Sequence, residues 1–230
     1  MKKWTKLLLI IIICLIIICG CGLGFLFLGS TTENVGSNHL GYVEKITYSY
    51  YGDAPVTIVI ISGMHSREKL HQSVLPDVAQ SFALLHNCKV INYKIHVTSK
   101  PNDFNIGRTN GESLVHDFVV KDLKKEGGAD LVIIGHDHEP GYGEDYYIAT
   151  PTMDNGSVKL AKKVTSMIGF KYYQRNTTQA TKSTSINTVD YPLLKTHSKV
   201  FVYEIPEVDS EAGAITKSYE LVRASYEVLS

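Results

Sequence analysis

The hydrophobic positions along the chain follow two periods, and their alternation predicts an α/β fold. Short runs of β-branched and aliphatic residues, typical of buried strands, are separated by longer segments whose apolar residues recur every three or four positions, as in helices. Strands are expected at residues 42–51, 56–61, 90–97, 130–135 and 199–205. Helices are expected at residues 67–85, 112–125, 156–168 and 211–229. This order predicts a mixed, mostly parallel sheet with helices on both faces.

The segments between these elements are rich in turn-forming residues. Loops are therefore expected at residues 101–111 (PNDFNIGRTNG) and 142–155, and a polar, irregular segment at residues 171–196. Gly127 and Gly128 are expected to end the second helix, and Pro76 to kink or split the first.

The first 28 residues have a different pattern from the rest of the chain. Three lysines precede an uncharged apolar stretch at residues 7–28, which is long enough to span a bilayer core about 30 Å thick. We expect a single-pass membrane anchor with the remainder of the chain extracytoplasmic, because basic residues favour the cytoplasmic side. A cleaved secretory signal, which would give a secreted protein, is the alternative. Residues 29–41 then predict a polar linker, and residues 42–230 one domain.

Composition narrows the possible partners and metal ligands. The 230 residues carry 23 basic and 23 acidic side chains, and the basic ones form no dense cluster beyond the N-terminus, so we expect no nucleic-acid partner. Three of the four cysteines lie in the apolar N-terminal stretch. With Cys88 alone in the domain, neither an internal disulfide nor a cysteine-based zinc site is possible there.

The strand at residues 56–61 is followed directly by candidate metal ligands. His65 and Glu68 are three positions apart, which places them on one face of a first helical turn. An imidazole and a carboxylate aimed at one point suit Zn²⁺. Ligands also usually bind at the carboxyl ends of strands in open α/β sheets. A His-x-x-Glu pair alone occurs by chance in many proteins.

Two further strand ends carry residues of the same chemical types. His136 follows the strand at residues 130–135, and two strand ends at one sheet edge can converge on one metal. His138 is the alternative ligand or a partner of the site. Glu204 lies near the end of the last strand, with Glu207 and Glu211 as weaker candidates. Taken singly, these residues are equally compatible with a polar loop and a solvent-facing strand end.

Taken together, three strings resemble the motifs of the zinc metallocarboxypeptidase family, the pancreatic-type zinc carboxypeptidases and their relatives. They are GMHSRE at residues 63–68, GHDH at 135–138 and FVYE at 201–204, in the family's order, and the resemblance runs from about residue 56 to residue 229. It implies that His65, Glu68 and His136 hold one Zn²⁺ ion and that Glu204 is the general acid and base. It also implies hydrolysis by a metal-activated water.

The substrate-binding residues of the family are matched less closely. Only 71 residues separate His65 from His136, which implies a compact member with fewer elements around the substrate. The family's Asn-Arg pair, which grips a C-terminal carboxylate, is absent as such, and Arg108 with Asn110 is the nearest substitute. An arginine near the metal, Arg108 or Arg67, is expected to stabilise an oxyanion or bind a substrate carboxylate.

The tyrosine that binds substrate in the family has three candidates here, Tyr142, Tyr146 and Tyr147. The short spacing is closer to the related deacylases of the aspartoacylase and succinylglutamate desuccinylase type. Those proteins usually carry Gly where Ser66 stands, so the HSRE string favours a peptidase. We therefore expect an anchored zinc peptidase acting on peptide or cell-wall-type amide bonds. The alternatives are a zinc deacylase of small acylated amino acids and a non-catalytic envelope binding module on the same fold.

Overall fold

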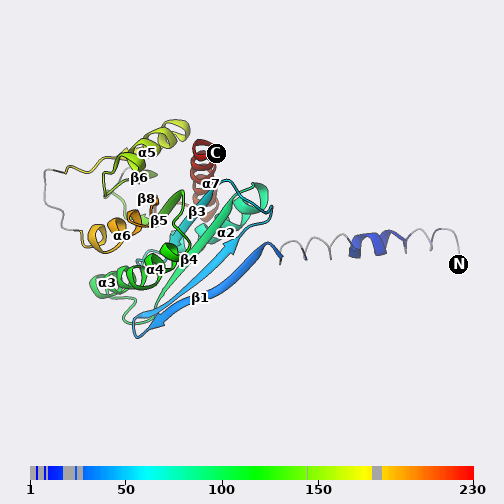
Figure 1. Ribbon diagram of the computed structural model, residues 1–230, viewed down its shortest axis with the longest axis horizontal. Coiled ribbons are helices and arrows are strands. Elements are labelled where there is room, and N and C mark those ends of the chain that lie inside the picture. Colours follow the sequence, from blue (N-terminus) through cyan, green and yellow to red (C-terminus); the bar gives the residue numbers. More distant parts are fainter. Residues whose placement is uncertain are drawn as a thin grey trace.

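An eight-stranded mixed sheet crosses the molecule and carries helices on both faces (Figure 1). The computed structural model describes residues 4, 8, 10–17, 24, 28–143, 145–177 and 183–230. The strands are β1 (Ser30–Asn38), β2 (Gly41–Tyr48), β3 (Thr57–Ser62), β4 (Lys89–Val97), β5 (Leu131–His138), β6 (Tyr147–Ala149), β7 (Lys171–Tyr173) and β8 (Lys199–Pro206).

The strand order in the sheet is β1-β2-β4-β3-β5-β8-β6-β7. The four central strands β4, β3, β5 and β8 are parallel, so their carboxyl ends lie at the same edge of the sheet. Strands β1 and β2 extend one side in antiparallel register, and β6 pairs antiparallel with β8 on the other side.

The helices divide between the two faces of the sheet. One face is covered by α2 (Leu70–Leu85), α5 (Asn155–Ile168) and α7 (Glu211–Leu229). The other face is covered by α3 (Phe104–Leu114), the π-helix η1 (Val115–Val119), α4 (Val120–Lys125), the π-helix η2 (Ile186–Asp190) and α6 (Tyr191–Leu194). The predicted fold class, a mostly parallel α/β sheet between two helical layers, is confirmed for the described part of the chain.

Side chains of the central strands alternate between the two helical layers. In β5, Leu131 and Ile133 pack in the core beneath α2, whereas Val132 and Ile134 pack beneath α3 and α6. Because successive side chains of a strand point to opposite faces, this parity continues to the end of β5. It directs His136 to the α3 side of the sheet and Asp137 to the α2 side.

Two segments expected to be irregular are regular in the structure. The expected linker at residues 29–41 is mostly strand β1, which pairs with β2 along its length with one irregularity between Asn34 and Gly36. Its side chains are mostly exposed at the edge of the sheet, so backbone hydrogen bonds hold it and no apolar alternation marks it in the sequence. The expected irregular segment at residues 171–196 contains β7, η2 and α6, and β6 lies in the loop expected at residues 142–155.

The loop expected at residues 101–111 is also wrong, because α3 begins at Phe104. The carboxylate of Asp103 accepts a hydrogen bond from the backbone N–H of Ile106 at 2.8 Å and caps the helix. The glycines of this segment allow its backbone to lie close to neighbouring backbone segments. A Cβ atom at Gly111 would lie 1.7 Å from the carbonyl oxygen of Met64. Turn-forming composition therefore misled the prediction. Pro76, in contrast, does not split α2, which is continuous from Leu70 to Leu85.

The expected membrane segment at residues 7–28 lies largely outside the described residues. Residues 10–17 are helical, and their large apolar side chains are exposed. Within the part of the chain that the structure describes, no helix is both long and apolar enough to cross a membrane.

Gly111→Ala tests the close contact between α3 and the segment after β3. Alanine favours a helix over glycine by roughly 1 kcal/mol, yet the added methyl group would overlap the Met64 carbonyl. We expect a net loss of about 1–3 kcal/mol in the free energy of unfolding, measured by urea denaturation. Thr109→Ala, at an exposed position of the same helix, is the control and should stay within about 0.5 kcal/mol of wild type. Equal stability of Gly111→Ala and wild type would refute the contact.

Candidate metal centre

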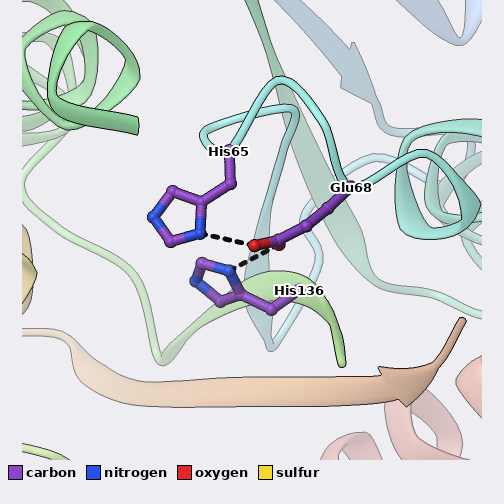
Figure 2. Close-up of side chains that lie close together, drawn as sticks. All are labelled: His65, Glu68 and His136. Atoms are coloured by element: carbon purple, nitrogen blue, oxygen red, sulfur yellow. Dashed lines mark hydrogen bonds and ion pairs between the residues drawn. The ribbon is translucent and has the colours of Figure 1, made fainter. Parts of the chain in front are cut away.

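The carboxylate of Glu68 lies between two imidazole rings (Figure 2). Its Oε1 is 2.8 Å from Nδ1 of His65, and its Oε2 is 2.9 Å from Nδ1 of His136. The two ring centroids are 4.3 Å apart. One ligand atom from each of the three residues lies within 4.8 Å of the other two. The structure thus brings together all three residues predicted to hold the metal.

The three side chains come from two adjacent parallel strands of the sheet. His65 and Glu68 occupy the connection between β3 and α2, and His136 lies in β5, next to β3. The expectation of a first helical turn at His65 is corrected, since α2 begins only at Leu70. Instead the N–H of Glu68 donates to the carbonyl of His65 at 3.1 Å. This turn gives the same spacing and brings both side chains to one point.

The connection starts with a glycine that no other residue could replace without strain. Gly63 has φ of +81°, in the left-handed region that favours glycine. A Cβ atom there would lie 2.4 Å from the carbonyl oxygen of Ile95. Gly63 therefore lets the chain turn sharply at the end of β3 and directs His65 across the sheet edge.

These residues fit a zinc ion by their chemistry and their convergence. Zn²⁺ binds imidazole nitrogen and carboxylate oxygen at roughly 2.0–2.2 Å, and catalytic sites use three protein ligands with one position left for water. Two imidazoles and one carboxylate within 4.8 Å of one another supply that set. His138, the alternative ligand, lines the same cavity, but its Nε2 lies 3.0 Å from the carbonyl oxygen of Asp145 and it is not part of the cluster.

The charge of Glu68 suits cation binding, whereas His65 must be in its neutral form to bind a metal. Burial alone would raise the pKa of Glu68, but the neighbouring imidazoles of His136 and His65 outweigh it and hold that pKa well below its usual range. Burial lowers the pKa of His65, and the carboxylates of Glu112 and Glu68 overcome this and raise it. Glu68 is therefore ionised across the physiological pH range, as metal coordination requires.

Sequence reasoning missed a carboxylate behind His65. Glu112 on α3 is 1% exposed, and its Oε1 lies 3.7 Å from Nε2 of His65, the ring nitrogen that faces away from Glu68. Thr184 donates to its Oε2 at 2.7 Å, and Nε of Arg108 lies 3.4 Å from its Oε1. Carboxylates behind metal-bound imidazoles orient the ring and raise its basicity. The feature of the sequence that could have identified Glu112 is its place on the apolar side of the helix expected at residues 112–125.

Glu204 lies beside His136, on the neighbouring strand β8. It is the register partner of His136 across the β5–β8 pair, and strand parity directs both side chains to the same face. Burial raises the pKa of Glu204, and the nearby His136 partly offsets this. Within the described residues its carboxylate has neither an ion pair nor a hydrogen bond, so it is available for proton transfer. Glu207 lines the cavity as well, whereas Glu211 does not.

A cavity of about 660 Å³ surrounds the cluster at the carboxyl edge of the sheet. Three arginines line it, Arg67, Arg108 and Arg175, together with Tyr142, Tyr147 and Tyr173. The structure does not bring Asn110 to this cavity, because its amide donates to the carbonyl of Ser99 at 2.8 Å. Tyr146 also points away and donates to the carboxylate of Asp209. Arg108 thus lines the cavity, although it lies on α3 and not on the expected loop, while Asn110 has a structural contact.

A second buried carboxylate, also missed from the sequence, lines the cavity on the side of η2. Asp190 is 2% exposed, and its Oδ2 has no hydrogen-bond partner within the described residues. Burial raises its pKa to about 7, with His136 acting in the opposite direction and Glu112 in the same one. It lay in a segment without apolar periodicity, so no pattern in the sequence singled it out.

Comparison with known proteins places this geometry in a fold group. The sequence matches no protein-family profile and no curated protein sequence. Solved structures do match. A metallocarboxypeptidase from Pseudomonas aeruginosa, in complex with (2-guanidinoethylmercapto)succinic acid, superposes with a TM-score of 0.58 at 12% identity, over 86% of this chain and 64% of that one.

Two further structures match over a similar part of the chain. The tripeptide-bound cell shape determinant protein Csd4 from Helicobacter pylori has a TM-score of 0.53 at 13% identity, over 81% of this chain and 55% of that one. A protein from Shewanella denitrificans, provisionally described as a metallopeptidase, has a TM-score of 0.54 at 14% identity, over 86% and 83%. The chain thus spans little more than half of Csd4 and just under two thirds of the Pseudomonas protein. These likenesses, together with the cluster at the sheet edge, show that this chain has the fold of the zinc metallocarboxypeptidases.

Proposed function

We propose that this protein is a zinc-dependent peptidase that hydrolyses peptide or cell-wall-type amide bonds. The observation that carries the proposal is the convergence of His65, Glu68 and His136 in a cavity that Glu204 also lines. Three protein ligands with an adjacent unpaired carboxylate are the arrangement of a hydrolytic site, since a purely structural zinc site has four protein ligands and is closed.

Each residue has a defined task in this mechanism. His65, Glu68 and His136 would hold the ion, with the Glu112 carboxylate 3.7 Å from the second ring nitrogen of His65. A bound Zn²⁺ supplies a Lewis acid that polarises the scissile carbonyl and acidifies water. Glu204 accepts the proton of the attacking water and delivers it to the leaving amine. Its position beside His136, on the neighbouring strand, suits this transfer.

The cavity favours a substrate that carries a carboxylate. Arg67, Arg108 and Arg175 line it, and guanidinium groups bind carboxylates through paired hydrogen bonds. The tripeptide bound to Csd4, on the same fold, supports a peptide substrate. We propose in addition that the apolar N-terminal stretch anchors the protein in the cell membrane with this domain outside, as its flanking lysines indicate.

The metal assignment predicts one Zn²⁺ per chain, lost on removal of any ligand. We expect His65→Ala and His136→Ala to weaken zinc binding by more than about 100-fold, since even the loss of a residue behind a ligand costs about 10–100-fold. His138→Ala should keep the ion, because its ring lies outside the cluster. Metal analysis after dialysis and competition with a chelator measure both effects. Zinc retained in His65→Ala but lost in His138→Ala would overturn the ligand set.

The assignment of Glu204 predicts a variant that binds but does not turn over. Glu204→Gln should keep zinc and substrate affinity and lose about 10²–10⁴-fold in kcat, the usual contribution of general acid–base catalysis. Glu68→Gln should instead weaken zinc binding. Glu211→Gln, outside the cavity, is the matched control and should behave as wild type. Loss of metal in Glu204→Gln, or near-normal kcat, would transfer the role to Glu139 or Glu207, which also line the cavity.

Arg108 is predicted to bind the substrate carboxylate. Arg108→Ala should lower kcat/KM for a tripeptide with a free C-terminus by about 10–100-fold, since hydrogen bonds to charged groups contribute about 1.5–3 kcal/mol. The loss should be smaller for the C-terminally amidated tripeptide. Arg223→Ala, on the exposed surface of α7, is the control. Equal losses for both tripeptides would exclude this role, and faster hydrolysis of N-acyl amino acids by wild type would identify a deacylase.

A further inference from the structure

A pair of buried side chains on the far side of the sheet edge joins the segments that carry the metal ligands. His71, in the first turn of α2, is 0% exposed, and the side chain of Asp137 in β5 is 1% exposed. Neither residue lies in the cluster of His65, Glu68 and His136. We propose that His71 and Asp137 are positioning residues that hold these three ligands in register. The inference rests on the zinc site of the proposed function.

The carboxylate of Asp137 ties β5 to the start of α2. Its Oδ2 accepts from the backbone N–H of Leu70 at 2.6 Å, and its Oδ1 accepts from the N–H of His71 at 2.8 Å. Nδ1 of the His71 ring lies 3.1 Å from the same Oδ1. Leu70 is two residues after Glu68, and Asp137 directly follows His136. One carboxylate therefore sets the distance between two of the ligands.

The His71 ring extends the network to the third ligand. Its Nε2 accepts a hydrogen bond from the backbone N–H of Gly63 at 3.0 Å, two residues before His65. Because an amide N–H can only donate, Nε2 carries the lone pair and Nδ1 carries the hydrogen given to Asp137. The backbone N–H of Asp137 also lies 3.2 Å from Oε2 of Glu68. Each contact thus ends within two residues of a ligand or on a ligand itself.

The pair packs closely against a glycine of β5. A Cβ atom at Gly135 would lie 2.3 Å from Cδ1 of Leu75 and 3.2 Å from Cδ2 of His71, so a glycine beside His136 leaves room chiefly for Leu75 and also for the ring. A buried polar pair is often no more stabilising than apolar side chains of similar volume. The bond from Gly63 to His71 adds nothing to the capping of α2 by Asp137. Its geometric effect is to fix where His65 leaves β3.

His71→Asn tests this role, because asparagine can still donate to Asp137 but is too short to reach Gly63. We expect zinc affinity to fall about 10–100-fold, as for other residues behind metal ligands. The visible absorption spectrum of the Co²⁺-loaded protein should also change, since it reports ligand geometry. The thermal unfolding midpoint of the metal-free protein should fall no more than in His86→Asn. His86 lies at the other end of α2, where its ring bonds the hydroxyl of Tyr219 at 3.0 Å.

The outcomes separate this inference from the proposed function. Wild-type zinc affinity and an unchanged Co²⁺ spectrum in folded His71→Asn would overturn the positioning role and leave the proposed function intact. A wild-type protein that binds no zinc would overturn both. A lower unfolding midpoint without a change in affinity or spectrum would assign His71 to stability alone. If His71→Asn does not fold, the same measurements on His71→Leu, which is apolar and makes neither hydrogen bond, decide between these results.

Discussion

The relative placement of the proposed metal ligands depends on how Asp137 meets the amino end of α2. This helix has no side-chain cap of its own at Lys69 and no acidic residue in its first turn. Its free N–H groups and the positive end of its dipole would be uncompensated in a buried position. The carboxylate of Asp137, supplied from β5, satisfies two of these groups. The helix that follows His65 and Glu68 is therefore fixed to the strand that carries His136.

The same edge of the sheet also requires several backbones to approach closely. Gly63 passes the carbonyl of Ile95 and Gly111 passes the carbonyl of Met64, while Gly135 leaves space for the side chain of Leu75 and for the ring of His71. A side chain at any of these positions would shift a segment that carries a ligand. The glycines therefore contribute because they have no side chain, whereas Asp137 contributes through its hydrogen bonds. The close backbone contacts and the hydrogen bonds of Asp137 together restrict where His65 and His136 can lie.

Sequence reasoning recovered what has a strong local signature. The runs at residues 56–61, 130–135 and 199–205 predicted the parallel strands, and residues placed directly after strands predicted His65, Glu68 and His136. Strand β1 was not predicted because an exposed edge strand has no alternation of apolar and polar residues. Helix α3 was not predicted in full because its glycines and asparagines are typical of turns. Glu112, Asp190 and the pair of His71 with Asp137 gain their significance only from contacts between distant segments, which no local pattern reports.

The direction of β1 fixes where the polypeptide joins the sheet relative to the cavity. Ser30 pairs with Tyr48, and Tyr48 pairs with Val90, which lies beside Ile58 at the amino end of the parallel strands. The cavity opens at the carboxyl end, and eight residues of β5 at about 3.3 Å each span roughly 25 Å between the two poles. The polypeptide therefore enters the sheet at one end of the parallel strands, and the cavity opens at the other. A molecule that enters the cavity thus approaches the domain from the end opposite to the one at which the chain joins the sheet.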